Sequence, residues 1–218
     1  MEKIVIFGCT DFSELVGYYL ERDSRYSLLG YTVDRKYVST VQKSIRVVIP
    51  FEDLSQKLPD RDYRILLTVG YNSMNENRRQ TAARIRAAGY NLASYISKEA
   101  DVEAECMGEG TIILPGCVVQ PFCRLGEGNL FESGCTISHH AVIGDYNFFA
   151  PAVALAGQVH IGSNCFLGNN CTVKNGVSIS DRALIGAGAY VAHDVLADTV
   201  LVPERSVELP RKSSDMKI

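Results

Sequence analysis

From Met107 to Val191, every sixth residue of the chain is a bulky apolar one. The run holds fifteen such positions without a break, which random placement at 46% hydrophobic residues would produce about once in 10⁵ sequences. The residue after each apolar one is usually small, and a second small position lies two residues before it. Three such segments make an 18-residue coil with three flat sides, each a short strand pairing with the coils above and below. The pattern predicts a parallel β-helix of the hexapeptide type, with about five coils between 107 and 191.

Five of the seven cysteines fall in one position of this repeat, the small slot before the inward apolar residue. A cysteine in that slot acts as a small buried hydrophobe rather than as a nucleophile. We expect no two of the five to stack in adjacent coils, and therefore no zinc site among them. The chain has no CxxC pair, so we expect free thiols rather than a disulfide framework. The five are Cys117, Cys123, Cys135, Cys165 and Cys171.

The first 95 residues lack the six-residue period and alternate between strand and helix patterns. Short apolar runs predict strands, and apolar residues at helical spacing predict helices, the second one closed by Gly89. This order is typical of a small parallel sheet with helices packed against it, an α/β arrangement. We therefore expect two domains, residues 1–95 and 96–218. The expected strands are 3–7, 27–34, 63–71 and 91–96, and the expected helices are 12–22 and 74–89.

Polar residues follow three of these strands, at the sheet edge where ligands of parallel sheets bind. A carboxylate after the second strand suits a hydrogen bond from a ribose or a base, and the helix after the first strand offers N–H groups to an anion. The same residues could equally form turns and nothing more. There is no GxGxxG motif, so hydride transfer with a dinucleotide is not expected. The candidate binding residues are Gly8, Thr10, Asp34, Lys36, Tyr71 and Asn72.

Composition and charge exclude several classes of partner. The net charge is −3, from 22 basic and 25 acidic residues, and no Lys/Arg cluster stands out. We therefore expect no nucleic-acid partner and no membrane partner. The apolar run at the N-terminus is only four residues long, too short for a signal peptide, so we expect a cytoplasmic protein.

The combination of an α/β domain and a hexapeptide β-helix resembles a known family over nearly the whole chain. The segments HHAVIGDYNFFAPAVALAGQVHIGSNCFLGNNCTV (139–173) and LIGAGAYV (184–191) carry the resemblance most specifically. They are similar to bacterial sugar acetyltransferases, related to sialic acid O-acetyltransferases and nucleotide-sugar N-acetyltransferases. The resemblance implies a Rossmann-like acceptor domain before a left-handed β-helix, and a homotrimer with acetyl-CoA between two prisms. It also implies an acceptor that is a nucleotide-linked amino sugar used in building surface glycans.

By the same resemblance, His139 matches the general base, and Gly157, Ala187 and Gly188 match positions where the backbone meets the coenzyme. Asp34 and Lys36 match the nucleotide-binding strand end. Two positions depart from the pattern. His140 stands where many relatives have Glu or Asp, so the orienting carboxylate is missing or comes from elsewhere. The turn after the first strand is GCTD rather than glycine-rich, which leaves the identity of the acceptor open.

The repeat places His139 two residues after the inward Ile137, at a corner outside the hydrophobic interior. A neutral imidazole there could take a proton from an acceptor amine or hydroxyl as it attacks a thioester. His140 could orient His139 or contact the acceptor, and both histidines together form the candidate catalytic pair. The alternatives are solvent-exposed corner residues in a non-catalytic scaffold, an O-acetyltransferase, or transfer of a longer acyl group. A zinc enzyme is not expected, because the chain has no HxxxxH pair, and the GxGTR-type loop of nucleotidyltransferases is absent.

Overall fold

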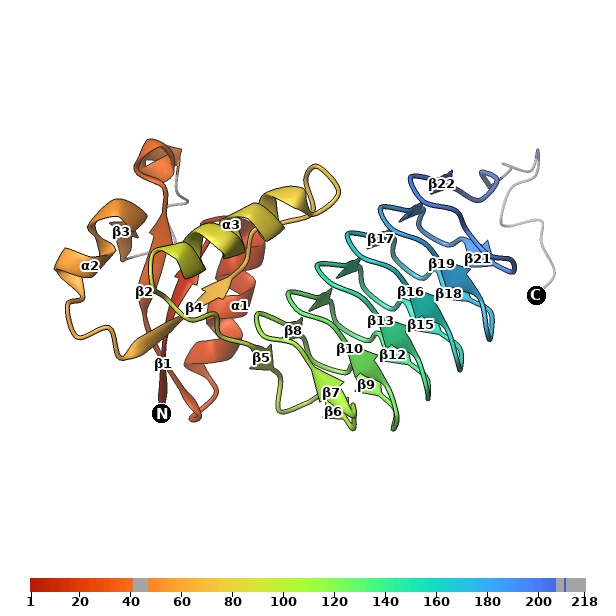
Figure 1. Ribbon diagram of the computed structural model, residues 1–218, viewed down its shortest axis with the longest axis horizontal. Coiled ribbons are helices and arrows are strands. Elements are labelled where there is room, and N and C mark those ends of the chain that lie inside the picture. The colour runs from red at the N-terminus through yellow and green to blue at the C-terminus, as the bar shows by residue number, and fades with distance from the viewer. Residues whose placement is uncertain (41–46, 207–209, 211–218) are drawn as a thin grey trace.

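The computed structural model describes residues 1–40, 47–206 and 210. The N-terminal domain contains a four-stranded parallel sheet with the strand order β3-β2-β1-β4 (Figure 1). Helix α1 covers one face, where Ile4 and Ile6 point, and α2 and α3 cover the other, where Val5 and Phe7 point. The strands are β1 (Glu2–Phe7), β2 (Tyr26–Val33), β3 (Val48–Pro50) and β4 (Tyr63–Leu67). The helices are α1 (Asp11–Glu21), α2 (Leu54–Lys57) and α3 (Glu76–Ala87), with 3₁₀ turns η1 (Arg35–Thr40) and η2 (Phe51–Asp53).

The C-terminal part of the chain is a left-handed β-helix, a prism of three parallel sheets of two-residue strands. Strands pair with a register of 18 residues, as in Thr136 with Ala154, so the predicted coil length is confirmed. The five-stranded sheet holds β7 (Cys106–Met107), β10 (Arg124–Leu125), β13 (Val142–Ile143), β16 (His160–Ile161) and β19 (Ser178–Ile179). The six-stranded sheet holds β6 (Asp101–Val102), β9 (Val118–Val119), β12 (Thr136–Ile137), β15 (Ala154–Leu155), β18 (Thr172–Val173) and β21 (Tyr190–Val191). The seven-stranded sheet holds β5 (Tyr95–Ile96), β8 (Ile112–Ile113), β11 (Leu130–Phe131), β14 (Phe148–Phe149), β17 (Phe166–Leu167), β20 (Leu184–Ile185) and β22 (Val200–Leu201).

The inward positions predicted from the six-residue period form the prism core. Met107 is partly buried at the open end, and all fourteen later positions, from Ile113 to Val191, are buried. The second residue of each corner has a positive φ, from Gly110 to Gly188 at intervals of six. Glycine suits this left-handed conformation best, but other residues also occupy it here, His140 among them.

The expected burial of the five repeat cysteines is confirmed, but the expectation that none would stack is wrong. Cys117 and Cys135 lie 18 residues apart in adjacent coils, and both are buried in the core. The thiol of Cys117 donates to the carbonyl of Glu132, and that of Cys135 donates to the carbonyl of Ala150. Burial raises the pKa of Cys165 to about 11 and that of Cys171 to about 12, so both remain protonated thiols at neutral pH. Among the described residues no group of three or more His, Cys, Asp or Glu side chains is placed to hold a metal ion.

The segment 91–96, predicted as one strand of the N-terminal sheet, is divided between the two domains. Leu92 bridges Ile65 in the N-terminal sheet, while β5 pairs with β8 in the prism. The prism therefore begins before the first recognisable repeat residue, Met107. The chain passes directly from one sheet into the other without a linker.

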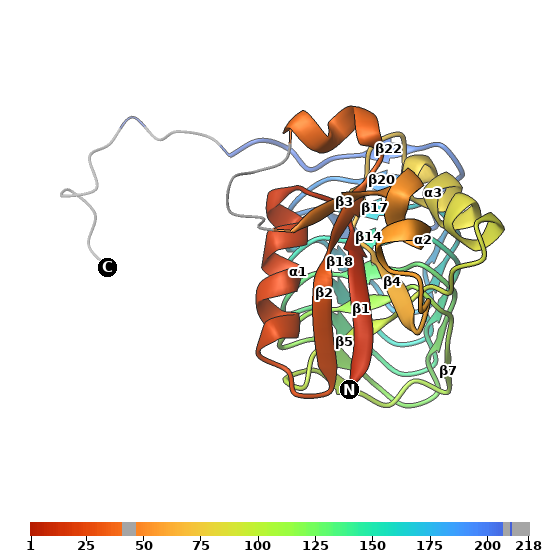
Figure 2. The same cartoon turned by 90° about the vertical axis from the view of Figure 1, so that its left-hand side faces the viewer.

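The N-terminal domain lies on the outer face of the seven-stranded sheet, at the start of the prism, whose coils extend along the long axis in Figure 1. The outward residues there are apolar, and Phe148 and Phe166 stack with ring centroids 5.4 Å apart. Residues before and within α3 also reach the prism corner: Asn75 donates to the carbonyl of Cys165, and Arg78 to that of Asn147, both at 2.9 Å. Viewed from the N-terminal domain, its sheet stands in front of the prism with α1 and α3 on opposite sides (Figure 2). None of the helices in the described part of the chain is long and apolar enough to cross a membrane.

Candidate functional site

His139 and His140 are the two turn residues of one prism corner, and the backbone of the turn is well fixed. The His139 N–H donates to Oε1 of Gln120 at 2.9 Å, and its carbonyl accepts from the N–H of Gln158 at 2.9 Å. His140 has φ 61, and its N–H faces the carbonyl of Pro121 at 3.4 Å. The corner position expected from the repeat is thus where the structure places His139, and both side chains are exposed.

The two imidazoles meet at their Nδ1 atoms, which are 3.1 Å apart. The rings are nearly perpendicular, at 86°, and the far side of His140 lies against Phe122 with ring centroids 4.8 Å apart. Nδ1 of His139 is therefore engaged by a neighbouring nitrogen. The other nitrogen of His139, Nε2, lies on the opposite edge of the ring and is available for chemistry.

The ring of His139 lies over Gly157, the residue one coil further along the same prism edge. A Cβ atom at residue 157 would stand 2.6 Å from Cε1 and 2.8 Å from Nε2 of His139, so only glycine leaves room for the imidazole. Gly157 is buried, and its N–H has no acceptor among the described residues. A free N–H beside a basic nitrogen is an arrangement that can stabilise a negative oxygen next to a proton acceptor. The side chain of Asn175, one more coil along, also reaches this point. We call this column of corners the histidine edge; its residues are 121–122, 139–140, 157–158 and 175–176.

The other two residues predicted to meet the coenzyme lie elsewhere. Ala187 and Gly188 form an exposed turn in the corner column that also contains 133–134, 151–152 and 169–170. This column and the histidine edge border the same six-stranded sheet from opposite sides. A single chain therefore does not bring Gly157 together with Ala187 and Gly188.

The N-terminal domain has a cavity of about 630 Å³ beyond the carboxyl ends of β1, β2 and β4. Four of the six predicted binding residues line it: Gly8, Thr10, Asp34 and Asn72. Gly8 has φ 148, and a side chain there would collide with Thr68, so this position requires glycine. The cavity thus coincides with the sheet edge that the sequence indicated.

Arg84 on α3 is a cavity residue that the sequence analysis missed. Its guanidinium lies 2.7 Å from the carboxylate of Asp34 and packs over the rings of Phe7 and Phe51. The only signal in the sequence was a basic residue on the polar side of the predicted helix 74–89, where several arginines look alike. Its partner is fifty residues away in the chain, so the pairing depends on how α3 packs.

Two predicted binding residues lie outside this cavity. Lys36 is exposed, and its Nζ lies 4.8 Å from the centre of the Tyr37 ring. The ring of Tyr71 packs against Phe148 and Phe166 of the prism, with centroids 4.9 Å from each. Tyr71 thus contacts the β-helix instead of lining the cavity.

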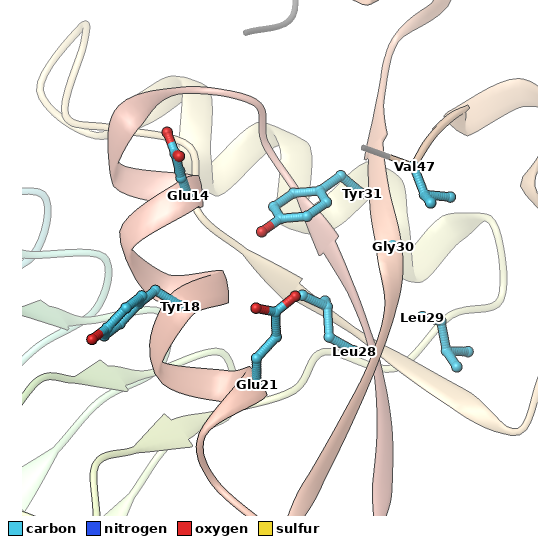
Figure 3. A pocket seen from close by; sticks show the side chains of 8 residues that line it. All are labelled: Glu14, Tyr18, Glu21, Leu28, Leu29, Gly30, Tyr31 and Val47. Atoms are coloured by element: carbon cyan, nitrogen blue, oxygen red, sulfur yellow. The ribbon is translucent and has the colours of Figure 1, made fainter. Parts of the chain in front are cut away.

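A second hollow, of about 430 Å³, lies between α1 and β2 (Figure 3). The carboxylates of Glu14 and Glu21 and the hydroxyl of Tyr31 border it. The Tyr31 hydroxyl passes over Gly17, where a side chain would block it. None of the predicted site residues contributes to this hollow.

The histidine edge and the Asp34 cavity face different sides of one chain. The N-terminal domain covers the seven-stranded sheet, and the histidine edge is the one corner column that does not border that sheet. A base and an acceptor held at these two places cannot meet within a single subunit.

Comparison with known proteins supports the two-domain architecture. A family model described as the hexapeptide repeat of succinyl-transferase matches residues 158–192. A search of curated protein sequences finds no significant match. Among solved structures, PerB of Caulobacter crescentus in complex with CoA and GDP-perosamine superposes with a TM-score of 0.82 and 23% identity, covering 93% of this chain and 95% of that one.

Two further structures have the same arrangement. The acetyltransferase domain of PglB from Neisseria gonorrhoeae, in complex with acetyl coenzyme A, has a TM-score of 0.80 and 20% identity, covering 93% of this chain and 96% of that one. WeeI of Acinetobacter baumannii has a TM-score of 0.77 and 19% identity, covering 93% and 97%. Two other structures of the Caulobacter perosamine N-acetyltransferase are of variants with one histidine replaced. The chain thus carries hexapeptide repeats, and over both domains it has the fold of these structures.

Proposed function

We propose that this protein transfers the acetyl group of acetyl-CoA to the amino group of a nucleotide-linked sugar, for use in building surface glycans. The observation that carries the proposal is the geometry at the histidine edge. The exposed imidazole of His139 has one nitrogen engaged and Nε2 free, and it stands beside the unpaired N–H of Gly157. Such a pair serves direct attack on a thioester, since it offers a proton acceptor and an oxyanion donor at one place.

The proposed reaction needs no covalent enzyme intermediate. The neutral amine attacks the thioester carbonyl, a C–N bond forms, and Nε2 of His139 takes the proton that the nitrogen loses. The N–H of Gly157 stabilises the oxyanion of the tetrahedral intermediate. The C–S bond then breaks, and the imidazolium returns its proton to the leaving thiolate, so His139 ends neutral as it began.

The Asp34 cavity is the proposed acceptor site. The carboxylate of Asp34 can accept hydrogen bonds from ribose hydroxyls, and the guanidinium of Arg84 beside it can bind a diphosphate. The first turn of α1, which begins after Thr10, adds backbone N–H groups that favour an anion. Binding of GDP-perosamine by the Caulobacter enzyme of the same fold supports a nucleotide-sugar ligand.

We further propose that the active form is a homotrimer. One chain keeps its histidine edge and its acceptor cavity on different sides, so a second copy is needed to bring a base to a bound acceptor. The same packing would let Gly157 of one prism and the turn at Ala187 and Gly188 of another flank a single donor groove. Sedimentation equilibrium should give a trimer at micromolar concentration, and a monomer with full activity would contradict this assembly.

The experiment for the function is a substrate panel. Acetyl-CoA is incubated with nucleotide-linked amino sugars, with the matching hydroxyl sugars and with free amino sugars, and thiol release is followed. We expect release with a nucleotide-linked amino sugar and none with its hydroxyl counterpart. Release with hydroxyl sugars alone would indicate an O-acetyltransferase. A protein that binds no acetyl-CoA, by calorimetry, would be a scaffold and not an enzyme.

A further inference from the structure

The contact between His139 and His140 joins two like atoms. Their Nδ1 nitrogens are 3.1 Å apart, so one must carry a hydrogen and donate while the other accepts through its lone pair. A neutral imidazole carries one N–H only. The direction of this hydrogen bond therefore decides which nitrogen of His139 is free to act as a base.

We propose that His140 is the positioning residue for His139, accepting a hydrogen bond from its Nδ1–H and so holding Nε2 as the basic nitrogen. This inference rests on the proposed function, since it assigns a partner to the proposed base. His140 then has the task that a carboxylate performs in other histidine dyads, with a neutral acceptor in place of an anion. When His139 takes a proton at Nε2, its Nδ1–H bond to His140 becomes charge-assisted, which stabilises the imidazolium.

The proposed role of His139 requires this direction. Only a hydrogen on Nδ1 of His139 leaves the lone pair on Nε2, the nitrogen whose ring edge lies over Gly157. His140 packs against the ring of Phe122, and the residue as a whole is exposed. Because a lone imidazole prefers hydrogen on Nε2, His140 needs no change from its favoured form in order to accept.

The proton count shows how the pair responds to acid. A proton added to His139 goes onto Nε2 and occupies the basic lone pair. A proton added to Nδ1 of His140 reverses the hydrogen bond, so that His139 must carry its own hydrogen on Nε2. In both cases His139 can no longer act as a base. A second added proton would place hydrogen on both Nδ1 atoms and break the contact. The described contacts of the pair are with uncharged residues: Gln120, Pro121 and Phe122 come from the preceding coil, and Gly157 and Gln158 from the next.

Two substitutions at residue 140 separate an acceptor from a bare truncation. His140→Asn keeps an oxygen that can accept from Nδ1–H but cannot be protonated in this pH range, while His140→Ala keeps nothing. Both residues suit the left-handed turn, because Asn170 and Ala152 already occupy the equivalent position with φ 55 and 60. Both variants should therefore fold, and the difference in their activity reports the acceptor.

The test combines kinetics with ¹⁵N NMR of the imidazoles in the full chain. We expect His140→Ala to lower kcat about tenfold and His140→Asn to stay within about threefold of wild type. In the spectra at a pH above the titration, His139 should carry its hydrogen on Nδ1 in wild type and in His140→Asn, and on Nε2 in His140→Ala. Equal kcat in the two variants, or hydrogen on Nε2 of His139 in the wild type, would overturn the proposal. The NMR result stands even if no acetyl transfer is found, so failure of the proposed function and failure of this inference are distinguishable.

Discussion

Gly157→Ala should disable the site by moving one ring while leaving the fold intact. The added methyl would stand 2.6 Å from Cε1 and 2.8 Å from Nε2 of His139, whereas non-bonded carbon atoms rest at about 3.5–4.0 Å. The imidazole must therefore shift by about 1 Å. A misplacement of that size in a reacting group can cost about 10²-fold in rate, so we expect kcat to fall by about that factor. The backbone of residue 157 does not have a positive φ, and Ala187 fills the same turn position in another corner, so we expect a stability cost of about 1 kcal/mol or less.

The assay is thiol release under saturating donor and acceptor, together with a thermal melt and calorimetric binding of acetyl-CoA. Gly134→Ala is the matched control: its φ is 76 and no atom lies within 4 Å of the added carbon. That control forces alanine into a left-handed turn and should cost about 1–2 kcal/mol of stability while keeping activity. The reasoning fails if Gly157→Ala keeps kcat within twofold of wild type, or if its loss of activity merely follows its loss of stability.

Three other outcomes follow from the contacts in the N-terminal domain. Asp34→Ala should raise the acceptor KM and leave the acetyl-CoA KM nearly unchanged, and equal effects on both would refute an acceptor site there. Burial lowers the pKa of Arg78 to about 9, and Arg78 has no carboxylate partner among the described residues. Arg78→Met should therefore leave the melting temperature unchanged or raise it. A loss of about 3 kcal/mol in the free energy of unfolding would contradict this. The Arg86 guanidinium holds the pKa of Glu127 below its usual range in the folded protein. The pair therefore stabilises the fold at any pH above the carboxyl pKa of the unfolded chain. That contribution is lost as the pH falls through the lower pKa of the folded protein. Glu127→Gln should therefore lower the melting temperature at pH 7 but not in acid, and a pH-independent difference would count against the pairing.

The prism was predictable because each repeat repeats one local requirement: an inward apolar residue between small ones. The position of His139 followed from that register without any knowledge of distant contacts. The docking face also had a signal, since the outward residues Ile112, Leu130, Phe148 and Phe166 recur every 18 residues on one side only. The inward positions alone carry the six-residue period, so that period does not point to the docking face.

The contacts that complete the site depend on how distant segments pack. The pairing of Asp34 with Arg84 requires α3 to lie across the strand ends, and nothing local to either residue specifies that. The approach of the two Nδ1 atoms depends on the left-handed backbone conformation at His140. Glycine or asparagine usually indicates that conformation in a sequence, and a histidine does not. Tyr71 was predicted to be a ligand residue because it follows a strand of the N-terminal sheet. Its ring instead packs on the prism, and a contact between two domains has no local signal in the sequence.

The most direct test of the central claim is kcat as a function of pH for acetyl transfer to a nucleotide-linked amino sugar, in the wild type and in His139→Ala. If His139 is the base, wild-type kcat falls on the acid side, and the variant loses that dependence together with about 10²-fold or more of its rate while still binding acetyl-CoA. A His139→Ala protein that keeps the acid limb and a kcat within a few-fold of wild type would contradict the account.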